Sequence, residues 1–128
     1  MKPNVLVFLA CTTTSWAALV QSGAHEMSRV GTCQPDRPHD VLRTAMAEVL
    51  SWMKTPCRVE FTVRDKSFPA FGWNSRTGAM GIAWARMFTA AENGRHDVSV
   101  FIPDKLGSEK FKDGFGRVEA LLTPGRTA

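Results

Sequence analysis

The sequence predicts an α+β fold in which one long amphipathic helix packs on a small, mainly antiparallel sheet. Apolar residues recur at helical spacing between residues 37 and 53, and apolar and charged residues then alternate from Cys57 to Arg64. This change of period from 3.6 to 2 indicates a helix followed by a strand with one buried face. With 128 residues, 44% of them apolar, the chain has room for one such domain.

The predicted helix has signals at both ends. Asp36 can cap its amino terminus, Pro38 suits its first turn, and Thr55-Pro56 stops the apolar period. We therefore expect this helix to cover the sheet. The residues that share its apolar face are Val41, Leu42, Ala45, Met46, Val49, Leu50 and Met53.

The amino-terminal residues have the order found in a secretory signal. Lys2 supplies a positive charge, an unbroken apolar run extends from Val5 to Cys11, and the small residues Ser15 and Ala17 stand where cleavage requires them. Residues 1–17 are therefore predicted to be a signal peptide. The predicted location is secreted, periplasmic or otherwise extracellular.

Other interpretations of the amino terminus stay open. Cleavage after residue 24 is a second choice, because Ser22 and Ala24 are also small. Polar residues at 12–15 interrupt the apolar run, so no transmembrane segment is predicted. The main alternative is that Val5 to Ala10 forms the buried first strand of a cytosolic α/β protein.

The domain and disulfide predictions follow from the signal. Cleavage after residue 17 removes Cys11 and leaves Cys33 and Cys57, which we expect to pair in an oxidising compartment. The predicted organisation is an extended lead-in at 18–35, a single α+β domain at 36–122 and a flexible tail at 123–128.

Two later segments each fit two structures. Residues 79–92 form a second helix that Asn93-Gly94 stops, or a strand that the same Asn-Gly joins by a hairpin to a strand ending at Ile102. Alternation from Val98 to Ile102 predicts a strand in either case. After a charged stretch and a turn at Asp113-Gly114, residues 115–122 form a short helix or an edge strand.

The loop between these segments is rich in aromatic residues. Phe68, Phe71 and Trp73 lie among prolines and glycines, with Arg76 close behind. Such a loop either folds back over the core or forms a surface for a partner. Phe68, Phe71, Trp73 and Arg76 are therefore the candidate binding residues, and the expected partner is an unidentified protein.

The chain also carries residues that suit acid–base chemistry. An outer sheet face with Glu60, Arg58 and Arg64 near a histidine such as His96 can bind and cleave a phosphodiester, although a salt-bridged face explains the same pattern. The formal charge of +4 permits binding to RNA or another polyanion. The cysteines and histidines lack the spacing of a zinc motif, so neither a metal nor a cofactor is predicted. Other acid–base candidates are His39, Asp40 and Asp97.

Several short motifs resemble a known family when taken in order. After a leader, a cysteine and one helix come Val59-Glu60-Phe61, Phe68-Pro69, Arg86-Met87-Phe88 and a turn at Asn93-Gly94. This order is similar to the fungal guanyl-specific ribonucleases and the ribonuclease-like secreted effectors of plant-pathogenic fungi. The resemblance implies that Glu60 is a general base, that Arg86 contacts phosphate and that 79–92 is antiparallel strand.

The chain departs from that family at catalytic positions. It has no tyrosine, no histidine after Val100 and no cysteine near its carboxyl terminus. Within the family these gaps imply a binding descendant without catalysis. Our interpretation from sequence is therefore a small secreted, disulfide-clipped, effector-like binding protein. The alternatives are a small secreted hydrolase acting on RNA through Glu60, Arg86 and His96, and a cytosolic α/β protein.

Overall fold

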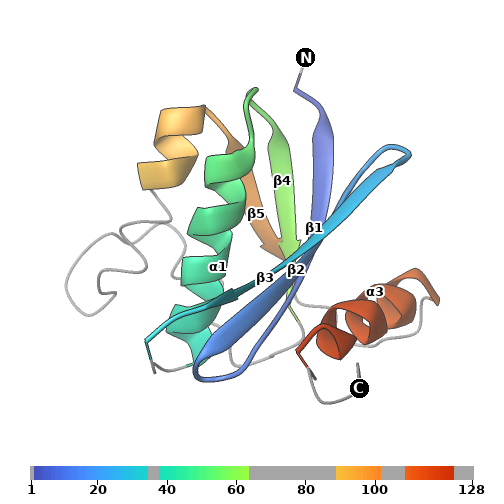
Figure 1. Cartoon of the computed structure of the whole chain (residues 1–128). Coiled ribbons are helices and arrows are strands. Elements are labelled where there is room, and N and C mark those ends of the chain that lie inside the picture. The colour runs from blue at the N-terminus through green and yellow to red at the C-terminus, as the bar shows by residue number, and fades with distance from the viewer. Residues whose placement is uncertain (1, 35–37, 64–88, 102–108, 123–128) are drawn as a thin grey trace.

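In the computed structural model, five strands form one mixed sheet in the order β3-β2-β1-β4-β5 (Figure 1). The structure describes residues 2–34, 38–63, 89–101 and 109–122. β2 runs antiparallel to both of its neighbours, β1 and β3, whereas β1, β4 and β5 are parallel to one another. The strands are β1 (Asn4–Cys11), β2 (Ser15–Ser22), β3 (His25–Thr32), β4 (Arg58–Thr62) and β5 (Asp97–Phe101).

Helices cover both faces of the sheet. Helix α1 (Pro38–Trp52) packs on one face, and α3 (Glu109–Ala120) packs on the other, against β1 and β2 (Figure 1). Residues 89–94 are helical and lead into β5. The helix predicted over 37–53 is confirmed as α1, but the predicted fold class is wrong. The sheet is mixed and two-sided, rather than small, mainly antiparallel and covered by one helix.

Strand β1 is apolar on both faces because both faces are covered. Val5, Val7 and Leu9 belong to the core under α1, whereas Phe8 belongs to the core under α3. A strand buried on both sides has no alternation, so its sequence is a continuous apolar run. The run interpreted as the apolar part of a signal thus forms the central strand, as the alternative interpretation expected.

The segment expected to be an extended lead-in also lies in the sheet. Residues 18–22 complete β2, and β3 pairs with β2 from Ser15↔Thr32 to Ser22↔His25. The turn between these strands contains Gly23 at φ 59°, a conformation that glycine adopts without steric cost. The first three strands are therefore a meander built from sequence neighbours.

The predicted Cys33–Cys57 disulfide is wrong. Cys11, Cys33 and Cys57 are all thiols in the structure. Cys33 follows β3, whereas Cys57 precedes β4, which is three strands away and so roughly 14 Å distant across the sheet. A disulfide needs Cα atoms within about 7 Å. The Cys57 thiol instead donates a hydrogen bond to the Thr55 carbonyl oxygen at 3.1 Å.

The carboxyl-terminal segment is helical, but it starts earlier than the sequence suggests. Helix α3 continues through Asp113 and Gly114, where a turn was predicted. Gly114 lies directly against the ring of Phe8, so that any Cβ there would overlap the ring. The close approach also brings Phe115 onto Phe8, edge to face, with centroids 5.4 Å apart. The glycine is therefore a packing requirement rather than a helix end.

The other ambiguous segment is described only in part. Residues 89–94 are helical, and Arg95 with φ 55° makes the turn into β5. The helical alternative is thus confirmed over 89–92, while residues 79–88 lie outside the described residues. No helix in the described part of the chain is long and apolar enough to cross a membrane.

Removal of residues 1–17 is expected to abolish cooperative folding. The deletion takes away β1, which contacts β2, β4, α1 and α3, together with the first three residues of β2. Urea unfolding followed by circular dichroism should show a cooperative transition for the full chain and none for the truncated one. Deletion of residues 1–2 alone is the matched control and should keep the transition. If the chain without residues 1–17 unfolded with the same free energy as the full chain and the chain without residues 1–2, the central position of β1 would be contradicted.

The two glycines of α3 should respond in opposite directions to alanine. Gly114→Ala forces a methyl group into the Phe8 ring and should destabilise the protein by about 1–3 kcal/mol through overpacking. Gly116→Ala meets open space and should stabilise it by up to about 1 kcal/mol through helix propensity. Free energies of unfolding from urea titrations measure both. If the two variants unfolded alike, the close packing of α3 on β1 would be refuted.

Candidate functional site

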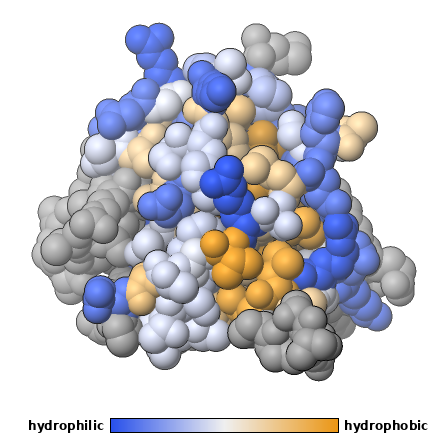
Figure 2. All heavy atoms as spheres, in the orientation of Figure 1, coloured by the Kyte–Doolittle hydropathy of each residue, from blue (hydrophilic) through white to orange (hydrophobic). Residues whose placement is uncertain are grey.

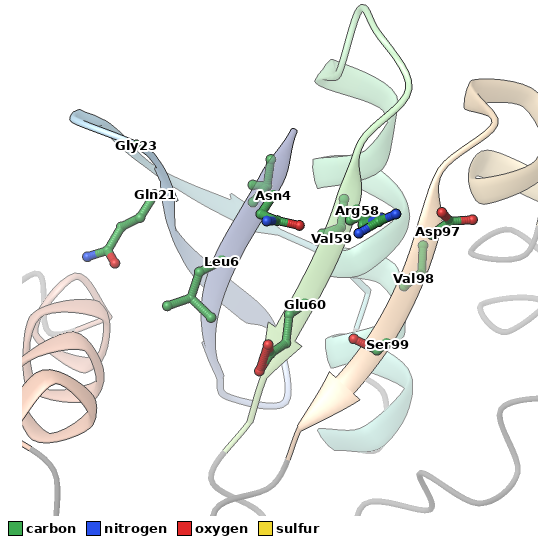
Figure 3. A pocket seen from close by; sticks show the side chains of 11 residues that line it. Asn4, Leu6, Gln21, Gly23, Arg58, Val59, Glu60, Asp97, Val98 and Ser99 are labelled. Atoms are coloured by element: carbon green, nitrogen blue, oxygen red, sulfur yellow. The ribbon is translucent and has the colours of Figure 1, made fainter. Parts of the chain in front are cut away.

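An open groove lies on the face of the sheet that carries α3. The helix covers the part of this face around Phe8, Ala17 and Leu19. The amino-terminal halves of β1, β4 and β5 are left open, and there a groove of about 630 Å³ is found (Figure 3). Its side chains come from two cross-strand rows and from the end of β2. The rows are Asn4–Arg58–Asp97 and Leu6–Glu60–Ser99.

Strand register explains why these side chains gather. In β4, residues two apart share a face, so Arg58 and Glu60 both point away from α1 while Val59 points toward it. Parallel pairing sets Asn4 and Asp97 on either side of Arg58. The alternation of side chains along β4 thus places polar residues on one face of the sheet and core residues on the other.

Glu60 and Arg58 are the uncommitted charges of the groove. Glu60 is half-buried and Arg58 is exposed, and neither side chain has a hydrogen bond or ion pair with the part of the chain that the structure describes. A carboxylate beside Leu6 loses some of its water, and the described residues give it no polar partner in return. Within the described part of the chain, no residue therefore competes with a ligand for either charge.

The rim of the groove next to β5 is held by a different pair. Lys2 Nζ lies 3.2 Å from Asp97 Oδ1, and both side chains are partly exposed. Such surface pairs contribute little to stability. The pair nevertheless neutralises Asp97, which leaves Arg58 as the cation of its row without a partner among the described residues.

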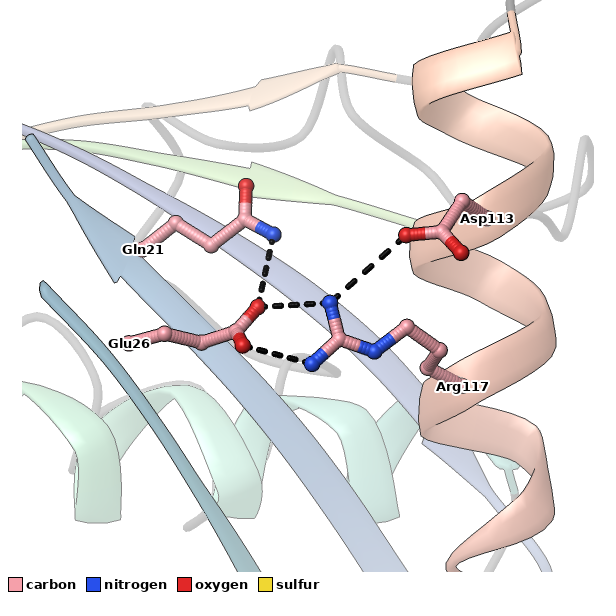
Figure 4. A network of polar contacts seen from close by, with 4 residues as sticks. All are labelled: Gln21, Glu26, Asp113 and Arg117. Carbon is pink, nitrogen blue, oxygen red and sulfur yellow. Dashed lines mark hydrogen bonds and ion pairs between the residues drawn. The ribbon is translucent and has the colours of Figure 1, made fainter. Parts of the chain in front are cut away.

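The opposite wall is connected to α3 through a polar network (Figure 4). Gln21 Nε2 donates a hydrogen bond to Glu26 Oε1 at 3.1 Å, and Arg117 donates to both carboxylate oxygens of Glu26, at 2.7 and 2.5 Å. Arg117 also lies 3.6 Å from Asp113. The Arg117 guanidinium, and next the Gln21 amide, hold the pKa of Glu26 below its usual value.

The structure separates His96 from Glu60. The imidazole is 8% exposed, and its Nδ1 accepts a hydrogen bond from the Cys57 backbone N–H at 3.0 Å. It thereby joins the start of β5 to the start of β4. Gly94 leaves the ring its space, since a Cβ there would overlap the imidazole. The expectation that His96 works beside Glu60 is therefore wrong, because the histidine is a buried structural link.

The other predicted site residues have mixed outcomes. Glu60 stands in the groove, as does Asp97. Arg86 and the candidate binding residues Phe68, Phe71, Trp73 and Arg76 lie outside the described residues. Asn4 and Gln21 were missed, because only strand pairing brings these neutral amides into the same groove as Glu60.

The described residues provide no ready metal site. Nowhere in ranges 2–34, 38–63, 89–101 and 109–122 do three His, Cys, Asp or Glu side chains converge. A divalent ion in phosphoryl transfer is held by several oxygen ligands. In the groove Glu60 is the single carboxylate without an ion pair to the described chain, so these residues do not fit such an ion.

Comparison with known proteins gives a likeness in structure. No family model and no curated protein matches the sequence. A solved structure, the crystal structure of LC9-RNase H1, "a type 1 RNase H with the type 2 active-site motif", superposes with a TM-score of 0.62 at 13% identity, covering 100% of this chain and 75% of that one. The chain has an RNase H fold. At this identity the likeness shows the fold alone.

This fold corrects two interpretations made from the sequence. The similar structure is a ribonuclease of the RNase H type, rather than the guanyl-specific type that the short motifs suggested. The interpretation as a disulfide-clipped, effector-like binding protein is wrong, because the disulfide is absent between the three described cysteines and the similar structure is an RNase H rather than an effector. The secreted location stays a prediction.

The buried histidine should make stability depend on pH. Burial of the imidazole lowers the pKa of His96 below its usual value near 6.5. The Leu50 backbone acts in the opposite direction but does not cancel this effect. The neutral form is favoured in the folded state, so stability is full above pH about 6.5 and falls below it, by up to about 1.4 kcal/mol per pH unit. Urea unfolding at pH 7.5, 6.5 and 5.5 measures this slope. It should shrink in His96→Gln and persist in His25→Gln, and an unchanged slope in His96→Gln would contradict the assignment.

Proposed function

We propose that the chain is a hydrolase that acts on RNA and binds the phosphodiester strand in the groove over β1, β4 and β5. The observation that carries this proposal is the pair Glu60 and Arg58, which have no side-chain partner among the described residues and stand on the open face of a sheet with the RNase H fold. A groove of this size accommodates a nucleotide unit. The net charge of +4 favours association with a polyanion.

Arg58 and Glu60 suit different parts of the reaction. Arg58 can donate two hydrogen bonds to a phosphate and offset the charge that develops at phosphorus. Glu60, one residue pair further along the same face, can take the proton of the attacking oxygen. The P–O bond to the leaving oxygen then breaks, and that oxygen takes a proton from water. Asn4 and Ser99 flank these groups and can hold the strand in register.

The proposal is tested by cleavage of a labelled oligoribonucleotide. Glu60→Gln should lower the rate by roughly a hundred- to ten-thousandfold, because the amide cannot accept the proton. Glu48→Gln, an isosteric change on the exposed side of α1, is the matched control and should leave the rate unchanged.

A second pair of variants tests the phosphate contact. Arg58→Gln should weaken binding, whereas Arg95→Gln, an exposed arginine outside the groove, should not. Absence of cleavage by the wild-type chain, or cleavage that survives Glu60→Gln, would reject the hydrolase.

A further inference from the structure

Gln21 is both part of the groove wall and part of the network that anchors α3. Its amide nitrogen points to Glu26 and its carbonyl oxygen is left for the groove. Figure 3 shows this oxygen on the side of the amide that faces Leu6, with the nitrogen turned away. No other polar contact holds the Gln21 side chain in the described part of the chain.

The chemistry of Glu26 fixes that orientation. An ionised carboxylate only accepts hydrogen bonds, so the amide must offer its NH₂ to Glu26. A flipped amide would instead set its carbonyl oxygen against the carboxylate. Arg117 donates to both oxygens of Glu26 and thereby keeps the carboxylate ionised and in place. The anchoring helix thus determines which polar group Gln21 presents to the groove.

We propose that Gln21 is a specificity-determining residue whose carbonyl oxygen, oriented by the positioning residues Glu26 and Arg117, accepts a hydrogen bond from a hydroxyl or amino group of the bound nucleic acid. This inference rests on the proposed function for the identity of the ligand. Glu60 is a second acceptor in the same groove, and both select a strand that offers donors. The donor is a ribose 2′-hydroxyl or a base amino group.

Binding of fluorescein-labelled oligonucleotides, measured by anisotropy, tests the role of Gln21. Gln21→Met keeps the length of the side chain but removes the acceptor, and it should weaken binding of an oligoribonucleotide roughly three- to tenfold. The same sequence with 2′-deoxyribose distinguishes the two donors. A loss confined to the ribose strand assigns the 2′-hydroxyl, and an equal loss on both strands assigns the base amino group. Unchanged binding of both strands by Gln21→Met overturns the proposal.

A double-mutant cycle tests the positioning role. Glu26→Gln should weaken binding by a similar factor, because the amide of Gln21 is then able to flip. In the Gln21→Met background the Glu26→Gln change should have no further effect. Arg117→Met, which leaves the Gln21–Glu26 bond, should have a smaller effect than Glu26→Gln. Additive losses in the cycle would show that Glu26 acts through general destabilisation and would overturn its positioning role.

A measurement on the free protein separates this inference from the proposed function. The side-chain amide resonances of Gln21 should shift as Glu26 titrates at acidic pH, and the shift should vanish in Glu26→Gln. If the Gln21 amide resonances did not respond to the titration of Glu26, the proposed orientation of the Gln21 amide would be overturned, even if RNA is bound and cut. RNA that binds with the predicted Gln21 dependence but is not cut rejects the hydrolase and upholds the assignment of Gln21.

Discussion

The fold depends on β1 being paired along both edges and packed on both faces. It pairs with β2 on one edge and β4 on the other, and its two faces contact α1 and α3. The other elements are positioned relative to this strand: the meander extends from one edge and the parallel strands from the other. The candidate groove exists because α3 covers only part of one face, over Phe8, and leaves the neighbourhood of Asn4 and Leu6 open.

The sequence predicted local elements better than their assembly. Helix α1 and strand β4 were found because each has one buried side, which produces a clear period. The run from Val5 to Cys11 has no period, since it is buried on both sides, and a buried central strand then looks like the apolar part of a signal. Gly114 was misleading in the same way, because its small size serves packing against Phe8 rather than a turn.

The site was predictable only through residues that carry charge. Glu60 was identified because a carboxylate on the outer face of a strand is informative by itself. Gln21 and Asn4 are neutral and distant in sequence, and they join Glu60 only through the pairing of β2 and β4 with β1. His96 illustrates the opposite error: its chemistry suggested catalysis, while its burial and its bond to the Cys57 N–H give it a structural role.

The topology has a consequence for how the chain reaches its native state as it leaves the ribosome. The meander of β1, β2 and β3 pairs sequence neighbours and closes quickly, whereas the parallel edge of β1 needs β4, which is synthesised after the whole of α1. Until then the most apolar strand of the nascent chain has one unsatisfied edge, and the face that α3 later covers is still open. The period between synthesis of β1 and docking of β4 is therefore when aggregation threatens most, and chaperones that hold apolar segments would act on this interval. In the finished molecule β3 is one of the two edge strands of the described sheet, and its Met27 and Val30 remain 44% and 51% exposed. Apolar residues gather in one patch where β2 and β3 approach α3 (Figure 2).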